Sequence, residues 1–379
     1  MPLILTEEQI MLRDSARSFL TRNAPVAHMR QLRDNRDPRG FSDALWKSFA
    51  EMGWAGILVP ENHGGMGLGY VEAGVVAEEM GHTLTPSPFL SSAVLAATAI
   101  MKGWSDAHKS EYLPRIATGD LIAALAVDET SKHRPRQTSL SAKRSGNGFI
   151  LNGLKTFVLD GHAAGLLIVA ARTAGAPGEE HGLTLFAVES SARGLKPERM
   201  SIVDSRNAAR LVFENVSAGA DAVIGGVDAG WAILDGTLNA GRACVAAEMT
   251  GVSDEVFNRT VSYLKERRQF AKLIGEFQAL QHRAARLYCE IEVTRSAVLK
   301  ALQALDNNFD QAGPIASVAK ARAGVSATLA VNEAVQMHGG IGMTDEFDAG
   351  LFMKRVRVDQ ELFGDANFHA DQLARRNHY

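Results

Sequence analysis

Apolar residues recur at helical spacing near the start of the chain. Thr6 is a plausible N-cap for a first helix, whose apolar positions are Ile10, Leu12, Ala16 and Leu20. A second helix is predicted around 44–52, and a third follows the glycine-rich segment 60–69. That segment lacks the G-x-x-x-x-G-K pattern and no strand precedes it, so we interpret it as a structural loop. Residues 1–118 are therefore predicted to form a helical domain.

Short strand-like runs replace the helical period between residues 119 and 226. The predicted strands are 121–127, 148–151, 166–170, 183–188 and 209–213. Turn signals such as Asn152-Gly153 separate them, and no helical crossovers of the kind that a parallel nucleotide-binding sheet requires lie between them. The pattern predicts an antiparallel barrel or sandwich.

Long helical periods return between residues 227 and 379. One apolar stripe recurs at spacings of three and four residues, through Phe277, Leu280, Ala284, Leu287 and Ile291. Further helices are predicted over about 231–267, 315–337 and 350–362. The expected fold class is α+β, with an N-terminal helical domain, a middle antiparallel β-barrel domain and a C-terminal four-helix bundle.

Composition excludes several classes of partner. The chain has 379 residues, a formal net charge of −3, 46% hydrophobic and 22% charged residues, which gives no electrostatic reason to expect nucleic acid or a membrane surface. No apolar run is long enough to span a bilayer, and the N-terminus lacks the pattern of a signal peptide, so a cytoplasmic location is expected. Cys244 and Cys289 are interpreted as small buried apolar residues.

Few residues point to chemistry by spacing alone. No H-x-x-x-H or C-x-x-C pair suggests a metal site, and no G-x-S-x-G elbow suggests a hydrolase. Asp128, Glu129 and His133 lie close together, but on a polar loop we interpret them as solvated. Two segments have two possible roles each, cofactor binding or ordinary helix capping. They are Arg267–Gln278, at a helix junction, and Gln336–Gly342, with adjacent glycines.

Several motifs in the same order resemble the acyl-CoA dehydrogenase family, over essentially the whole chain. They are Gly53–Pro60 with Gly64–Leu68, Glu78–His82, Leu113–Gly119, Leu151–Leu159, Arg267–Gln278 and Gln336–Gly342. The resemblance implies a subunit that binds FAD and an acyl-CoA thioester in a dimer or tetramer, with an electron-transfer flavoprotein as the expected acceptor.

The resemblance also implies positions for the cofactor. By motif, the FAD-contacting candidates are Arg267, Gln269, Phe270, Ile274, Phe277 and Gln278, and those for the pyrophosphate region are Gln336, Gly339 and Gly340. Phe157 matches an aromatic residue beside the flavin. Three departures weaken the match: Leu159 replaces a threonine that donates to the flavin, Ala271 replaces a glycine, and 128–135 lacks the family's flavin motif.

The largest departure concerns the base that removes the α-proton of the thioester. The glutamate of the family falls on Phe363, and the alternative position of some members falls on Gly241. Neither residue can accept a proton.

The candidate replacements are Glu248 and Asp365. Glu248 lies on the helix face of Gly241 but about 10 Å further along the axis, and a buried ion pair is the competing interpretation. Asp365 is equally suited to cap the last helix. Glu361 and Glu346 are further options.

Three functions remain open for the chain. It is an acyl-CoA dehydrogenase that acts as a homo-oligomer with a relocated base, or one subunit of a heterotetramer in which a related chain supplies the base. The third is a flavin-binding relative that does not dehydrogenate.

Overall fold

The chain forms two compact units in a computed structural model that describes residues 2–379. One unit combines the residues up to Arg30 with Tyr70–Thr85 and Arg242–Tyr379, and we call it the bundle unit. The other combines Gln31–Gly69 with Pro86–Gly241, and we call it the sheet unit. Within residues 2–379, none of the helices combines the length and the apolar character that crossing a lipid bilayer requires.

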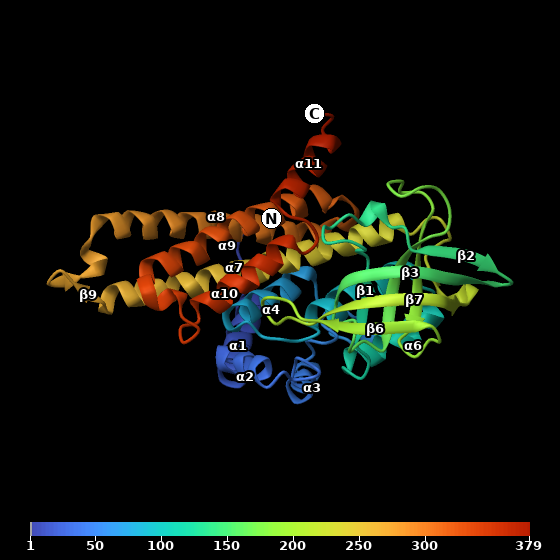
Figure 1. The fold of residues 1–379 in the computed structure, drawn as a ribbon, viewed down its shortest axis with the longest axis horizontal. Coiled ribbons are helices and arrows are strands. Elements are labelled where there is room, and N and C mark those ends of the chain that lie inside the picture. Colours follow the sequence, from blue (N-terminus) through green and yellow to red (C-terminus); the bar gives the residue numbers. More distant parts are fainter. Residues whose placement is uncertain (1) are drawn as a thin grey trace. The chain divides into compact units, whose positions relative to one another are not determined.

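The bundle unit is built from long helices, several of which run side by side in Figure 1. They are α1 (Glu7–Asn23), α4 (Tyr70–Thr83), α7 (Trp231–Glu266, which begins in the sheet unit), α8 (Gln278–Asn307), α9 (Gly313–His338), α10 (Ala349–Glu361) and α11 (Ala366–Arg376). Short 3₁₀ turns lie at Ile274–Glu276, Phe309–Gln311 and Gly339–Met343, and a small hairpin pairs β9 (Arg268–Gln269) with β10 (Lys272–Leu273).

Local sequence signals explain where the first of these helices begins. The side chain of Thr6 accepts a hydrogen bond from the backbone N–H of Gln9. The side chain of Gln9 accepts one from the backbone N–H of Thr6, so α1 starts on a full capping box. The predicted stripe of α8 is buried at Leu287 and Ile291 and continues along the helix. The period of this stripe therefore orients α8 toward its neighbours.

Helices α4 and α7 approach each other closely because glycines lie where they cross. A Cβ on Gly81 would lie 2.2 Å from the carbonyl oxygen of Glu248, and one on Gly251 would lie 1.9 Å from that of Glu78. Any larger residue at either position would force the helices apart. The close crossing brings polar side chains of both helices into contact.

The sheet unit holds an eight-stranded sheet with short helices. The strands are β1 (Ala123–Ala126), β2 (Ser141–Ser145), β3 (Gly148–Leu159), β4 (Leu166–Arg172), β5 (Leu183–Glu189), β6 (Leu195–Met200), β7 (Ala208–Ala218) and β8 (Val223–Ile224). The helical segments are α3 (Asp43–Glu51), α5 (Ala97–Gly103), α6 (Asp106–Ala117), a π-helical segment (Phe89–Ala96) and 3₁₀ turns at Glu61–His63, Pro135–Gln137 and Ala220–Ala222. Helix α2 (Val26–Asp34) joins the two units in sequence.

The strand order is β6-β7-β3-β2-β4-β5-β8, and most neighbours are antiparallel, as predicted. Strand β1 departs from the prediction, because it pairs parallel with β4. The connection from β1 to β4 runs through the β2–β3 hairpin and not through a helix. Strands β2 and β6 were not predicted, since they have few apolar residues to set a period, and α2 was not predicted either.

Other predictions can be compared with the described residues. The segment 60–69 is a structural loop, closed by backbone bonds from Met66 to Gly56 and from Gly67 to Val59. Cys244 is buried, but the prediction for Cys289 was wrong, because its side chain is exposed on α8.

Candidate functional site

The hairpin between α7 and α8 and the end of α9 form one structure at an end of the bundle unit. Leu264, Ile274 and Met337 make a small buried cluster, and the half-buried rings of Tyr263 and Phe277 pack against it. Leu264 lies in the last turn of α7, Ile274 follows the hairpin and Met337 lies near the end of α9. This cluster brings together Arg267–Gln278 and Gln336–Gly342, the two segments whose role the sequence did not decide.

The polar and aromatic residues of this hairpin face outward. Phe270 is 86% exposed at the hairpin turn, where its φ is +51°. Arg267, Arg268 and Gln269 are exposed too, and no hydrogen bond or ion pair engages their side chains among residues 2–379. An exposed ring beside unengaged guanidinium groups suits an anionic ligand with a planar portion.

The glycines after α9 leave the backbone open to approach. A Cβ on Gly339 or Gly340 would meet nothing within 4 Å, and Gly339 has a φ of +66° that favours glycine. Gln336, near the end of α9, and Gln278, at the start of α8, are exposed as well. The residues present therefore fit a bound phosphate-containing cofactor, with Ile274 and Phe277 as its apolar support.

The turn between α10 and α11 contains Phe363, the position on which the family's glutamate is expected to fall. Phe363 is 9% exposed and adopts a left-handed φ of +57°. Its carbonyl oxygen accepts a hydrogen bond of 3.2 Å from Nε of Arg242 on α7. Gly364 follows with a φ of +106°, and a Cβ there would lie 2.2 Å from the ring of Phe368.

A buried lysine holds the same turn from α9. Nζ of Lys320 donates to the carbonyl oxygens of Gln360, at 3.1 Å, and Gly364, at 3.0 Å. Burial lowers the pKa of Lys320 to about 7, while Asp359 acts in the opposite direction. Because Arg242 and Lys320 grip backbone oxygens, they fix the turn whatever side chain stands at position 363.

The candidate replacement bases have structural partners. Glu248 forms a buried ion pair of 2.8 Å with Nη1 of Arg355 on α10, which is the competing interpretation of the sequence. Asp365 caps α11 by accepting from the backbone N–H of Phe368 at 2.8 Å. Glu361 lies 3.3 Å from Arg357, and Glu346 is exposed.

In the sheet unit, the loop residues that we expected to be solvated are paired. His133 is buried and its Nδ1 lies 2.9 Å from Asp128, while Glu129 forms a 2.8 Å ion pair with the fully buried Lys155. Burial acts to raise the pKa of Glu129, but Lys155 outweighs it and the pKa is lowered. The solvated interpretation was wrong, because Lys155 reaches the loop from a strand that follows it.

The segment that matches the flavin-facing motif lies at the end of β3. Phe157 is exposed with a left-handed φ of +52°, whereas Leu159 is buried. The next residue, Asp160, is buried and accepts a 2.6 Å hydrogen bond from Oγ of Ser91. Burial raises the pKa of Asp160 to about 6. The buried state of Asp160 was not predicted, since its partner Ser91 lies far away along the chain.

We expect Asp160→Asn to stabilise the sheet unit above neutral pH. The folded pKa of this carboxyl exceeds 3.8, so its ionisation costs stability as pH rises through about 6. The amide avoids that cost and still accepts from Ser91. The gain at pH 8 is expected to reach about 3 kcal/mol at most and to vanish near pH 3.5.

Denaturant unfolding monitored by tryptophan fluorescence measures this effect, with Asp106→Asn as the control. The side chain of Asp106 is 97% exposed on α6, so its replacement should leave the pH dependence unchanged. A destabilised Asp160→Asn protein at pH 8 would show that the carboxylate is needed ionised.

Family models match the chain in three consecutive parts. The acyl-CoA dehydrogenase N-terminal domain matches residues 6–120, the middle domain 128–216 and the C-terminal domain 228–378. A protein of helical and sheet units with these segments in this order is of the acyl-CoA dehydrogenase class. The chain belongs to the acyl-CoA dehydrogenase family, a family of flavoproteins that bind FAD and act on acyl-CoA substrates.

Relatives and solved structures agree with this family. Mitochondrial isovaleryl-CoA dehydrogenase of Pongo abelii is 30% identical, over 93% of this chain and 85% of its own length. Acyl-CoA dehydrogenase fadE12 of Mycobacterium tuberculosis is 30% identical, over 94% of this chain and 92% of its own. The structure of glutaryl-coenzyme A dehydrogenase with glutaryl-CoA matches with a TM-score of 0.90 and 26% identity, over 100% of this chain and 96% of that chain.

Proposed function

We propose that this chain is a FAD-dependent acyl-CoA dehydrogenase subunit, which takes part in the α,β-dehydrogenation of an acyl-CoA thioester to a 2-enoyl-CoA. The observation that carries the proposal is the pairing of the Arg267–Gln278 hairpin with the Gly339-Gly340 turn through one buried cluster. Both segments belong to family motifs, and both present groups suited to an anionic cofactor. Acyl-CoA is the proposed substrate.

We assign the cofactor to two sets of residues in the bundle unit. One set, on the hairpin and the start of α8, comprises Arg267, Gln269, Phe270, Ile274, Phe277 and Gln278. The other, at the end of α9, comprises Gln336, Gly339 and Gly340, and Phe157 of the sheet unit is the proposed aromatic neighbour of the flavin. FAD, when bound, supplies the acceptor for the hydride from the β-carbon.

A second candidate function follows from the turn at Phe363. Dehydrogenation requires a base at the α-carbon, and neither Phe363 nor Gly241 can accept a proton. Glu248 is held by Arg355, and Asp365 by the N-terminus of α11. These engagements favour a chain that binds FAD and substrate while a related partner subunit of a heterotetramer supplies the base.

The proposed assembly is therefore an oligomer. A homodimer or homotetramer suits the first candidate, and a heterotetramer suits the second. In both, the exposed hairpin residues would gain partners on assembly, and an electron-transfer flavoprotein is the proposed acceptor of the electrons.

We expect Gly340→Val to abolish the retention of FAD on purification. Nothing lies within 4 Å of a Cβ at Gly340, so the chain accommodates the valine, but the two methyl groups block close approach to the backbone. Absorbance of the purified protein gives the ratio of flavin to chain.

Gly350→Val is the matched control, because a Cβ on Gly350 of α10 also meets nothing within 4 Å. The control should keep its FAD and its melting temperature. Equal FAD content in wild type and Gly340→Val would remove the turn from the cofactor site.

A further inference from the structure

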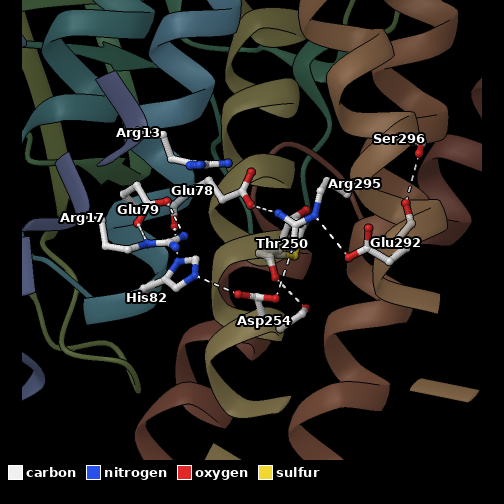
Figure 2. A network of polar contacts seen from close by, with 12 residues as sticks. Arg13, Arg17, Glu78, Glu79, His82, Thr250, Asp254, Glu292, Arg295 and Ser296 are labelled. Carbon is white, nitrogen blue, oxygen red and sulfur yellow. Dashed lines mark hydrogen bonds and ion pairs between the residues drawn. The ribbon is translucent and has the colours of Figure 1, made fainter. Parts of the chain in front are cut away.

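A network of charged side chains joins four helices of the bundle unit where α4 crosses α7. Figure 2 shows His82 of α4 directed toward Asp254 of α7. Arg17 of α1 and Arg295 of α8 reach the same network from either side. Where α4 and α7 cross, the side chains of Glu79 and His82 are only 1% and 11% exposed, whereas Arg17 and Arg295 stay partly in water.

Both ring nitrogens of His82 face acceptors. Nδ1 lies 3.0 Å from the backbone carbonyl oxygen of Glu78, which can only accept. Nε2 lies 3.2 Å from Oδ2 of Asp254. Asp254 is ionised, because its other oxygen lies 3.3 Å from the guanidinium of Arg295. A neutral imidazole donates from one nitrogen only, so both contacts are satisfied only by the imidazolium.

His338 shows the alternative within the same unit. Its Nδ1 lies 2.7 Å from the carbonyl oxygen of Ala334, the same contact to the preceding helical turn that His82 makes. Its Nε2 is buried without a hydrogen-bond partner among the described residues. Burial lowers the pKa of His338. The carboxylate of Asp254 is therefore what sets His82 apart.

The charges around His82 favour its protonated ring, because carboxylates outnumber guanidinium groups in the network. Arg13 of α1 is drawn near Glu78 in Figure 2, and its guanidinium pairs with Asp14. On α4, Glu79 is 1% exposed and receives two bonds from Arg17, of 2.8 and 2.9 Å. On the same helix, Glu78 pairs with Arg295, which also pairs with Asp254. Glu78, Glu79 and Asp254 thus face two guanidinium groups, and protonated His82 supplies the third positive charge. A fourth carboxylate, that of Glu292 on α8, lies 3.5 Å from Arg295 at the edge of the network and is partly exposed.

We propose that His82 and Asp254 form a pH-sensitive clamp, which fastens α1 and α4 to α7 and α8 while His82 is protonated and loosens as the ring loses its proton. The clamp is a conformational device of the bundle unit and is independent of the proposed function. Deprotonation leaves one nitrogen lone pair directed at an acceptor and an excess of carboxylates in a buried place.

The direction of the pH effect follows from the network. Burial lowers the pKa of His82, but Asp254 and the neighbouring glutamates outweigh it, and the pKa is raised above 6.5. The pKa of Glu78 is also raised, chiefly by burial. Both groups stabilise the fold fully below their unfolded pKa values, and that stability is lost as pH rises through the folded ones.

The C2-proton exchange of individual histidines in the folded, full-length protein, followed by mass spectrometry, measures the pKa of His82 directly. We expect His82 to titrate above 6.5 and His338 below it. Asp254→Asn should move the pKa of His82 downward, because an amide oxygen or nitrogen accommodates a neutral ring. A pKa of His82 at or below 6.5, or one that Asp254→Asn leaves unchanged, would overturn the proposal.

Backbone amide exchange of α4 tests the loosening. The measured quantity is the amide exchange rate of α4 in the wild type divided by the rate in His82→Gln. Between pH 6 and 9 this ratio should rise about tenfold for each unit by which the pKa of His82 in the folded protein exceeds its value in the unfolded chain. Comparison with the variant at each pH cancels the intrinsic pH dependence of exchange. His282→Gln, an exposed position on α8, should follow the wild type. A ratio that stays constant over this range would overturn the clamp.

Discussion

Phe363→Glu is expected to raise the rate at which acyl-CoA reduces the flavin of this chain by about 10² to 10⁴-fold, the usual contribution of a positioned base. The turn is held through the carbonyl oxygens of Phe363 and Gly364, by Arg242 and Lys320. The new side chain therefore starts from a backbone that does not depend on the phenyl ring. Anaerobic stopped-flow absorbance with straight-chain and branched acyl-CoAs measures the rate.

Phe363→Gln is the control for this gain. The glutamine has nearly the shape of glutamate but cannot take the α-proton, so its rate should match that of the wild type. Equal rates for the glutamate and glutamine variants, with FAD and acyl-CoA both bound, would show that position 363 does not face the α-carbon.

Arg355→Met is expected to destabilise the bundle unit by about 3–5 kcal/mol, since it removes the guanidinium from a buried carboxylate. Arg355 and Glu248 join α10 to α7, and both side chains are largely buried. Thermal unfolding followed by circular dichroism at pH 7 to 8 measures the loss.

Arg357→Met on the same helix is the matched control. Its side chain is 63% exposed and lies 3.3 Å from Glu361, so the loss is expected to stay within about 0.5 kcal/mol. A similar small loss for Arg355→Met would mean that Glu248 is neutral in the fold, and would return it to the list of candidate bases.

The sequence predicted the elements whose signals are local. Thr6 and Gln9 cap α1 across three residues, and Asp365 caps α11 in the same way. The α8 stripe needed only its own period. These features depend on neighbours within one or two helical turns, which is the range over which a sequence pattern carries geometry.

The features that the sequence missed depend on distant partners. Strand β1 pairs parallel with β4, more than thirty residues further on, and no local pattern distinguishes that pairing from an antiparallel one. The ion pair of Glu248 could be anticipated from its burial, but its partner Arg355 could not. The pKa of Asp160 is raised by burial among residues distant in sequence, and that of His82 is raised against burial by Asp254 on α7.

The features of the candidate site also differ in whether their sequence signals are local or depend on distant partners. The hairpin and glycine residues match family motifs in the sequence, and the cluster of Leu264, Ile274 and Met337 explains how two motifs distant in sequence come to lie together. The absence of the family's base at position 363 stays a prediction from the sequence. The hydrogen bonds that hold the backbone of this turn could not be predicted. Lys320 and Arg242 donate them to carbonyl oxygens that no sequence pattern marks.

Whether the chain holds FAD without a base of its own is tested most directly by one spectrum. The full-length chain is purified alone, and its visible absorbance is recorded before and after anaerobic addition of acyl-CoA. We predict a flavin-containing protein whose absorbance acyl-CoA does not bleach on the time scale of turnover. A colourless protein would contradict the cofactor assignment, and rapid bleaching would contradict the absence of a base.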